Sequence, residues 1–179
     1  MAEYQIVIAG FGGQGLLFSG KVLAYAALME QRELSWLPSY GPEMRGGTAN
    51  CNVIISDSPV GSPIVQNPNV LMVMNTPSLD KYEKDVVPGG KIFVDSAMVS
   101  RKVTRDDVEV YYIPATRMAG EMGMPNLANM ILLGAIVKAT GCVGEEAVMA
   151  GLKKIVSARH ADLLDANLQA MQAGKDFLA

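Results

Sequence analysis

The chain has 179 residues, enough for one hydrophobic core but too few for two ordinary domains, so we expect a single domain over residues 1–179. Half of the residues are hydrophobic and 18% are charged, yet no stretch approaches the roughly 20 consecutive apolar residues of a membrane span. The net charge of −3 and the isoelectric point near 5.2 give no electrostatic basis for binding nucleic acid or an anionic membrane, and we expect neither as a partner.

The first expected strand leads into a glycine-rich turn. An apolar run precedes Gly10-Phe-Gly-Gly-Gln-Gly15, which has the spacing G-x-G-x-x-G. Small and apolar residues at spacings of three and four then predict a helix from Gly13 to about Met29. A Rossmann-like first turn of this kind would place free amides at a helix start, where they favour an anion. The alternative is a plain turn between a strand and a helix.

The second expected strand, from Leu34 to Leu37, bears on which ligand the turn could hold. A dinucleotide-binding Rossmann unit needs an acidic residue near the carboxyl end of this strand to hold the ribose hydroxyls. That end reads Pro38-Ser-Tyr40, and Glu33 lies at the other end of the strand. The sequence therefore lacks the feature that most favours NAD.

A second glycine-containing loop follows, Pro38-Ser-Tyr-Gly-Pro-Glu-Met-Arg-Gly-Gly-Thr48, and a strand over 49–55 comes after it. One interpretation is a solvated connection in which Glu43 and Arg45 pair at the surface. The other is a ligand site, because the loop should leave the carboxyl end of a strand next to the first strand. Arg45 and the amides of Gly46 and Gly47 could then hold a phosphate or a carboxylate.

The remaining pattern alternates strands and helices before it becomes helical. Strands are expected at 70–74, 91–94 and 109–113, and helices at 79–84, 126–139, 145–157 and 161–173. This order predicts an α/β fold: a Rossmann-like, three-layer, mostly parallel sheet with helices on both faces, and a helical C-terminal third.

Few side chains in the last third suggest chemistry. Asn126 and Asn129 are three residues apart and share a helix face, where capping and core hydrogen bonding are as plausible as contact with a ligand or partner. His160 has no acidic or cysteine partner at catalytic spacing, and we expect it to cap a helix end. We therefore assign no catalytic residue to this chain.

The two cysteines, Cys51 and Cys142, are too few and too far apart in sequence for a CxxC zinc site or a four-thiolate iron–sulfur cluster. If the protein serves redox chemistry, another chain must carry the electrons, and we expect no metal ligands here. A strand is expected almost at the first residue, which leaves no room for a signal peptide, so we expect a cytoplasmic protein.

Taken together, the first glycine turn and the stretch Pro38-Ser-Tyr-Gly-Pro-Glu-Met-Arg-Gly-Gly-Thr-Ala-Asn-Cys51 resemble the gamma subunit of the 2-oxoacid:ferredoxin oxidoreductases. The resemblance is closest to the 2-oxoglutarate (2-ketoglutarate) type, within the wider pyruvate/ketoisovalerate gamma family. It covers essentially the whole chain, and Leu79-Asp-Lys81 and Pro88-Gly-Gly90 fit it as well.

This resemblance implies a complex that converts a 2-oxoacid and coenzyme A to acyl-CoA and CO2 and passes two electrons to ferredoxin. Thiamine diphosphate and the iron–sulfur clusters would lie in partner subunits: alpha, beta and a ferredoxin-like delta. The gamma subunit would be inactive alone and would share a coenzyme A site. By resemblance, the contacts to coenzyme A are assigned to two groups of residues: Gly12, Gly13, Gln14 and Gly15, and Arg45, Gly46 and Gly47. The alternative function is a free-standing nucleotide-binding module or an NAD-dependent oxidoreductase.

Overall fold

The computed structural model describes residues 2–39 and 48–179. The strands are β1 (Glu3–Phe11), β2 (Glu33–Ser39), β3 (Thr48–Ser56), β4 (Val70–Val73), β5 (Lys91–Asp95) and β6 (Glu109–Ile113). The α-helices are α1 (Leu16–Met29), α2 (Thr76–Tyr82), α3 (Ala115–Glu121), α4 (Ala128–Thr140), α5 (Glu145–Ile155) and α6 (Ala161–Phe177). The short 3-10 helices in these described ranges are η2 (Glu83–Asp85), η3 (Pro125–Leu127) and η4 (Ala158–His160). No helix in the described ranges has the length and apolar character needed to cross a membrane.

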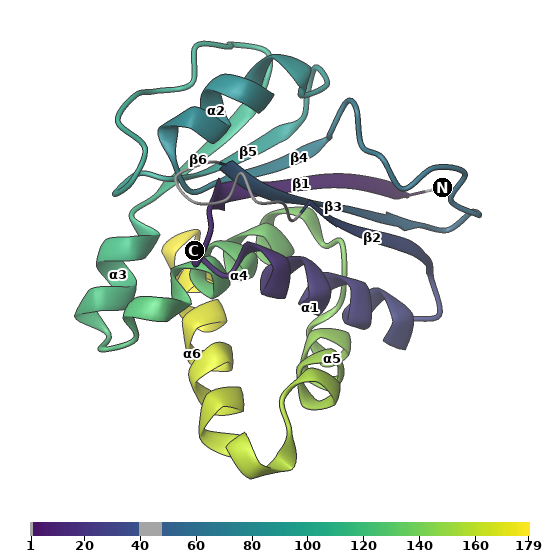
Figure 1. Ribbon diagram of the computed structural model, residues 1–179, viewed down its shortest axis with the longest axis vertical. Helices are drawn as coiled ribbons and strands as arrows, with labels where there is room; N and C mark the ends of the chain where they lie inside the picture. The colour runs from purple at the N-terminus through teal and green to yellow at the C-terminus, as the bar shows by residue number, and fades with distance from the viewer. Residues whose placement is uncertain (1, 40–47) are drawn as a thin grey trace.

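The strands form one mixed sheet in the order β2-β3-β1-β4-β5-β6 (Figure 1). β1, β4, β5 and β6 pair in parallel, and β4, α2 and β5 form a βαβ unit. β3 runs antiparallel to both of its neighbours, β1 and β2. The expected α/β fold with a mostly parallel sheet is therefore confirmed, with one reversed strand.

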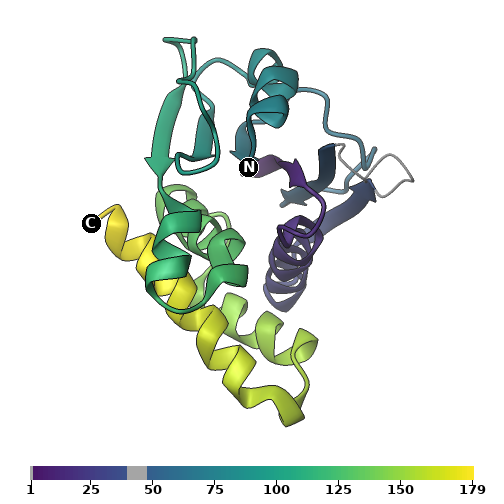
Figure 2. The same ribbon diagram turned by 60° about the vertical axis from the view of Figure 1, so that its left-hand side comes forward.

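Helices cover both faces of the sheet, giving three layers (Figure 1). Alternate residues of β1 point to opposite faces, so Ile6 and Ile8 pack in the core beneath α1 and α4, whereas Val7 and Ala9 pack in a second core beneath α2. The helical C-terminal third adds α5 and α6 to the α1 and α4 side. Figure 2 shows α6 running diagonally along α4.

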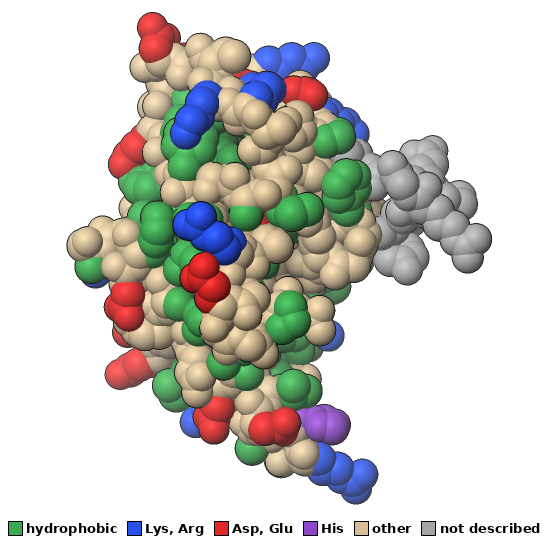
Figure 3. All heavy atoms as spheres, turned by 90° about the vertical axis from the view of Figure 1, so that its left-hand side faces the viewer, with side chains coloured by type: hydrophobic (Ala, Val, Ile, Leu, Met, Phe, Trp, Pro, Cys, Tyr) green, Lys and Arg blue, Asp and Glu red, His purple; other side chains and the backbone are tan. Residues whose placement is uncertain are grey.

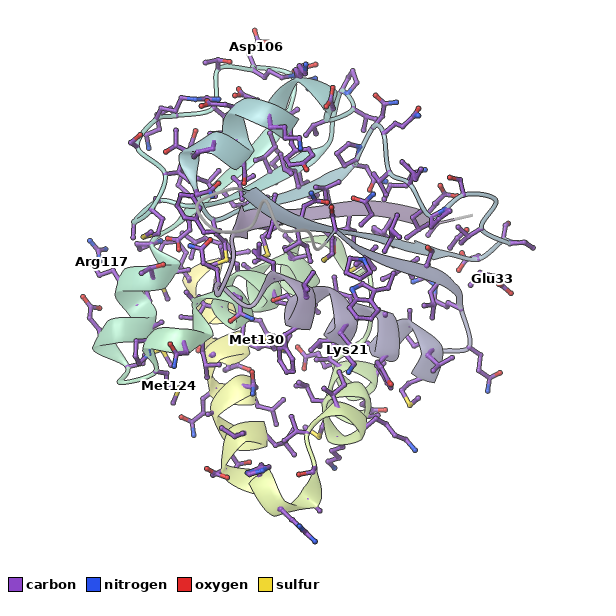
Figure 4. All side chains as sticks on the ribbon, viewed as in Figure 1. Lys21, Glu33, Asp106, Arg117, Met124 and Met130 are labelled. Carbon is purple, nitrogen blue, oxygen red and sulfur yellow. The ribbon has the colours of Figure 1, made fainter. Side chains whose placement is uncertain are left out.

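The helix α4 is buried on nearly all sides, as its apolar sequence predicts. Every residue from Ala128 to Val137 is buried. Contacts to α6, α3, α1 and β5 surround it. Met130, in the first turn of α4, lies below the sheet in Figure 4. Because α4 is held so firmly, its first turn is a rigid support for whatever lies beside it.

Three local expectations differ from the structure. The first helix begins at Leu16 rather than Gly13, because Gly13 and Gly15 adopt positive φ angles that an α-helix does not contain. The sequence pattern does not predict α3, whose short length gives too few turns for a clear periodicity. β1 and β2 are not neighbours: β2 and β3 pair as a hairpin, and β3 takes the place beside β1.

Candidate functional site

The glycine turn joins β1 to α1 at the carboxyl edge of the sheet. Gly13 and Gly15 have φ angles of 88° and 75°, a conformation that costs other L-residues about 1–2 kcal/mol. Gly15 is the N-cap of α1, and its carbonyl accepts a hydrogen bond from the amide of Ser19 at 3.1 Å. No described group accepts a hydrogen bond from the amide of Gly12 or Gly13. The turn thus presents free N–H groups at the positive end of a helix dipole, an arrangement that favours an anion.

The side chain of Gln14 ties the turn to the neighbouring strand. Its Oε1 atom accepts a hydrogen bond from the amide of Phe11 at 2.7 Å. Its Nε2 atom donates to the carbonyl of Met74, directly after β4, at 3.1 Å. The carboxamide of Gln14 therefore spans the carboxyl ends of β1 and β4, the strands whose following helices lie on opposite faces of the sheet. In an open α/β sheet such a position is where ligands usually bind.

Asn129 supports the turn from the opposite side. This residue of α4 is only 2% exposed, and its Nδ2 atom donates to the carbonyl of Gly15 and to Oγ of Ser19, each at 3.0 Å. The core hydrogen-bonding interpretation therefore holds for Asn129. Asn126 lies in η3 and is exposed, so the two asparagines have different environments.

A pocket of about 320 Å3, which we call the turn pocket, lies directly beside the glycine turn. Its walls combine backbone of the turn with the first turn of α1 and one residue of β3. They comprise Phe11, Gly12, Gly13, Gly15, Leu16, Leu17, Phe18 and Ala49. Of the four first-turn residues assigned to coenzyme A, Gly12, Gly13 and Gly15 line this pocket, whereas Gln14 lines a neighbouring pocket of about 130 Å3 with Met74, Thr116 and Asn126.

The second candidate loop can be placed only by its ends. Arg45, Gly46 and Gly47, and Glu43 with them, lie outside the described residues. β3 begins at Thr48, which pairs with Phe11 in the register of β1 and β3. Ser39, the last residue of β2, pairs with Asn50. Thr48, where β3 begins, therefore lies directly beside the glycine turn, although β2 is not the neighbour of β1 that we expected.

Asp95 is a buried group at the same edge of the sheet that the sequence analysis did not single out. It ends β5, is 0% exposed, and accepts hydrogen bonds from the amide of Thr116 at 3.2 Å and the amide of Ala97 at 3.1 Å. Burial raises the pKa of this carboxyl, although these hydrogen bonds oppose the shift. Thr116 lies in the first turn of α3, so Asp95 fastens α3 to β5. The sequence signal that could have identified Asp95 is an acidic residue at the end of an apolar strand.

The cysteines and the histidine lie apart from this site. Burial raises the pKa of Cys51 to about 12 and also raises the pKa of Cys142, so both thiols stay protonated. Within residues 2–39 and 48–179, no group of three or more His, Cys, Asp or Glu side chains could hold a metal ion. The histidine, His160, protrudes at the lower end of the molecule in Figure 3 and ends η4 before α6.

Comparison with known proteins identifies the family. The sequence signature of the family described as pyruvate ferredoxin/flavodoxin oxidoreductase matches residues 5–177. The chain belongs to this family. Among its relatives, ketoisovalerate oxidoreductase subunit VorA of Methanothermobacter thermautotrophicus is 41% identical over 98% of this chain, and the match spans 36% of VorA. The chain therefore spans about a third of the length of this relative. The 2-oxoglutarate synthase subunit KorC of Methanothermobacter marburgensis is 38% identical over 97% of this chain and 96% of KorC.

Solved structures agree with this assignment. The gamma subunit of a keto/oxoacid ferredoxin oxidoreductase from Geobacter sulfurreducens has a TM-score of 0.82 and 31% identity, covering 97% of this chain and 96% of that chain. The 2-oxoglutarate:ferredoxin oxidoreductase from Magnetococcus marinus, solved with 2-oxoglutarate, coenzyme A and succinyl-CoA bound, has a TM-score of 0.88. Its identity is 24%, over 98% of this chain and 31% of that chain, so this likeness concerns the fold alone. The resemblance to gamma subunits is confirmed.

Proposed function

We propose that this protein is the gamma subunit of a multisubunit 2-oxoacid:ferredoxin oxidoreductase. The complex would convert a 2-oxoacid and coenzyme A to acyl-CoA and CO2 and reduce ferredoxin. The observation that carries the proposal is the family match over residues 5–177, together with a relative, KorC, that the chain matches over 96% of its length. In this proposal, thiamine diphosphate and the iron–sulfur clusters belong to the alpha, beta and ferredoxin-like delta subunits, and the complex works in the cytoplasm.

We further propose that the glycine turn contributes to the coenzyme A site. The free amides of Gly12 and Gly13 at the start of α1 suit a phosphate group, and the turn pocket beside them has room for part of a ligand. Arg45, Gly46 and Gly47 precede Thr48 in the sequence, and Thr48 pairs with Phe11, which lines this pocket. The Magnetococcus marinus enzyme, which shares the fold of this chain, was solved with coenzyme A bound.

The contribution of Gln14 to this site is the least direct. In the structure the carboxamide of Gln14 is hydrogen-bonded to the Phe11 amide and the Met74 carbonyl. Only its remaining donor and acceptor positions are therefore available to a ligand. We therefore propose that Gln14 shapes the turn for coenzyme A rather than supplying its strongest contact.

For the substrate we favour 2-oxoglutarate, on the resemblance and on the match to KorC over nearly the full length of both chains. The identity to VorA is slightly higher, which makes ketoisovalerate the second candidate. Both candidates are 2-oxoacids, and the choice between them would be made largely by the subunits that hold thiamine diphosphate.

The competing function, an NAD-dependent oxidoreductase or free-standing nucleotide-binding module, has less support. Glu33, the acidic residue of β2, lies at the far end of the sheet from the glycine turn (Figure 4), where it pairs with Ser56. An acid in that place cannot reach a ribose bound at the turn.

Purification of the tagged chain from its native cell tests the proposal. Co-elution of a thiamine-binding chain and an iron–sulfur chain is expected, together with coenzyme A-dependent reduction of ferredoxin by 2-oxoglutarate or ketoisovalerate. Elution of the chain alone, with no 2-oxoacid oxidation in the sample, would contradict it.

A further inference from the structure

The smaller pocket beside the glycine turn, of about 130 Å3, is here called the Thr116 pocket. It lies where the turn meets the end of β4, the start of α3 and the start of α4 (Figure 1). Gly13 lines both this pocket and the turn pocket, so a ligand on the turn amides can extend from one into the other. Pockets for whole ligands measure roughly 300–1,000 Å3, so the Thr116 pocket suits one small chemical group.

Asp95 fixes the direction of the Thr116 hydroxyl. Oδ2 of Asp95 accepts hydrogen bonds from Oγ1 of Thr116 at 2.5 Å and from the Thr116 amide at 3.2 Å. Oδ1 of Asp95 accepts from the amide of Ala97. Because backbone amides can only donate, the oxygens of Asp95 act as acceptors, and the Thr116 hydroxyl directs its proton at Asp95. A hydroxyl has a single proton, so Thr116 offers the pocket an acceptor and no donor.

The glycine turn supplies donors to the same pocket. The amide of Gly13 has no acceptor among the described residues. The orientation of the Gln14 carboxamide is fixed, because Oε1 accepts from the Phe11 amide and Nε2 donates to the Met74 carbonyl. Nε2 of a carboxamide carries a second hydrogen, which this pair of bonds leaves free. The turn therefore presents donors, and Thr116 presents an acceptor.

This arrangement matches a secondary amide, whose C=O accepts from the turn while its N–H donates to Thr116. A carboxylate has no N–H for Thr116 and would lie near the buried carboxylate of Asp95, whereas an ammonium group has no acceptor for the turn donors. None of the described lining residues is charged, which also favours a neutral group. Methylene groups on either side of an amide suit the apolar part of the lining, which comprises Met74, Met98, Pro125 and Ala128.

We propose that the Thr116 pocket binds a secondary amide of the ligand held at the glycine turn, and that Thr116, positioned by Asp95, accepts the hydrogen bond from its N–H. The inference rests on the proposed function, in which this ligand is coenzyme A, whose phosphates carry a pantetheine arm that contains secondary amides. It adds a site for that arm to the phosphate contacts of the turn. It also assigns a role to Asp95 and Thr116, which neither the sequence motifs nor the family assignment single out.

The test compares coenzyme A with 3′-phosphoadenosine 5′-diphosphate, which keeps the phosphates of coenzyme A but lacks its amides. In the assembled complex, we would measure the KM for coenzyme A and the inhibition constant of the nucleotide as its competitor. Thr116→Val keeps the size of the side chain and removes the acceptor, so the KM should rise about threefold to tenfold. The inhibition constant should stay within about twofold of wild type, because the nucleotide has no amide to place in the pocket. Thr116→Ser keeps the hydroxyl and should leave both constants within about twofold of wild type.

Thr104→Val is the matched control for the loss of a structural hydrogen bond. Thr104 donates both its hydroxyl and its amide to the buried carboxylate of Glu83, as Thr116 does to Asp95, but it lies outside the Thr116 pocket. Thr104→Val should destabilise the protein to a similar extent and leave both constants within about twofold of wild type.

Met98→Ala is a second variant that the fold should tolerate, because Met98 is 40% exposed. It removes apolar contact with the methylenes of the arm, so the KM for coenzyme A should rise about threefold while the inhibition constant of the nucleotide does not change. If Thr116→Val and Met98→Ala raise both constants equally, or raise neither, the amide site is overturned and the proposed function stays intact. A wild-type complex whose activity does not depend on coenzyme A would overturn both.

Discussion

Asn129 and Gly15 touch so closely that any side chain in place of the glycine would require Asn129 to move. The Nδ2 atom of Asn129 donates to the carbonyl of Gly15 at 3.0 Å, and a Cβ atom built on Gly15 would lie 2.5 Å from that same nitrogen. In many G-x-G-x-x-G turns the glycines give a ligand room to approach the backbone. Here Gly15 gives that room to a side chain of the protein itself.

We predict that Gly15→Ala destabilises the protein by about 3 kcal/mol. The left-handed conformation accounts for about 1–2 kcal/mol and the displacement of Asn129 for the remainder. Gly13→Ala is the control, because Gly13 also has a positive φ angle but its Cβ atom would meet nothing within 4 Å. It should cost only about 1 kcal/mol. Urea unfolding of both variants measures the difference. Equal losses in the free energy of unfolding would show that Asn129 can move aside without destabilising the protein.

Gln14→Ala should loosen the turn without unfolding the domain. The variant loses the hydrogen bonds to the Phe11 amide and the Met74 carbonyl, at a cost of about 1–2 kcal/mol in the free energy of unfolding. Gln66→Ala serves as the control, since Gln66 is exposed and has no hydrogen bond among the described residues. Hydrogen exchange at Phe11 gives a local readout: its amide should exchange faster in Gln14→Ala only. Unchanged protection at Phe11 would mean that Gln14 does not hold the turn.

Ionisation of Glu83 should make the free energy of unfolding depend on pH at acidic pH, below the ordinary pKa of a glutamate. Burial acts to raise the pKa of this carboxyl, but hydrogen bonds from Thr104 and the guanidinium of Arg101, 2.7 Å away, outweigh burial and lower the pKa below 4.5. A lowered folded-state pKa contributes stability above the unfolded value, and this stability is lost as pH falls through the folded value. Glu83→Gln should therefore cost about 2 kcal/mol at about pH 7, and the difference should shrink below pH 4.5.

The free energies of unfolding of wild type and Glu83→Gln, measured from about pH 7 to about pH 3, test this prediction. Comparing the two proteins at each pH cancels the other carboxyl groups that titrate in the same range. A difference that stays constant from neutral pH to about pH 3 would show that the charge of Glu83 is not what the network requires.

Arg45→Ala should weaken coenzyme A binding in the assembled complex. Loss of a charge-assisted phosphate contact, worth about 1.5–3 kcal/mol, should raise the KM for coenzyme A about tenfold to a hundredfold and leave decarboxylation of the 2-oxoacid nearly intact. Arg117→Ala is the control, because among the described residues this arginine on α3, labelled in Figure 4, makes only an exposed ion pair with Glu121 at 3.8 Å. If coenzyme A dependence stays unchanged while the complex falls apart, Arg45 belongs to an interface.

The isolated chain should not oxidise 2-oxoacids with NAD. Its thiols are buried and protonated, and β2 offers no acid at the turn. The check is an absorbance assay for NADH with the pure protein and 2-oxoglutarate or ketoisovalerate, with the reconstituted complex as the positive control. NADH formation by the chain alone would favour the competing function.

The sequence predicts most elements of this fold because each has a clear local signal. The buried strand β4 is a continuous apolar run, and α4 is apolar on nearly all sides and followed by Gly141. The position of β3 between β1 and β2 has no such signal, since it depends on which strands pair in space. The same holds for the site: the free amides of the turn follow from its glycines, whereas the roles of Gln14 and Asn129 depend on groups 60 and 114 residues away in the chain.

The reversed strand β3 has a consequence for how this domain can vary. Its connection to β2 joins two antiparallel neighbours, and such a connection can gain or lose residues without moving the strands it joins. The links through α1 and α2 have no such freedom, because they must span the sheet. Relatives can therefore differ at residues 40–47 while β2 and β3 keep their pairing.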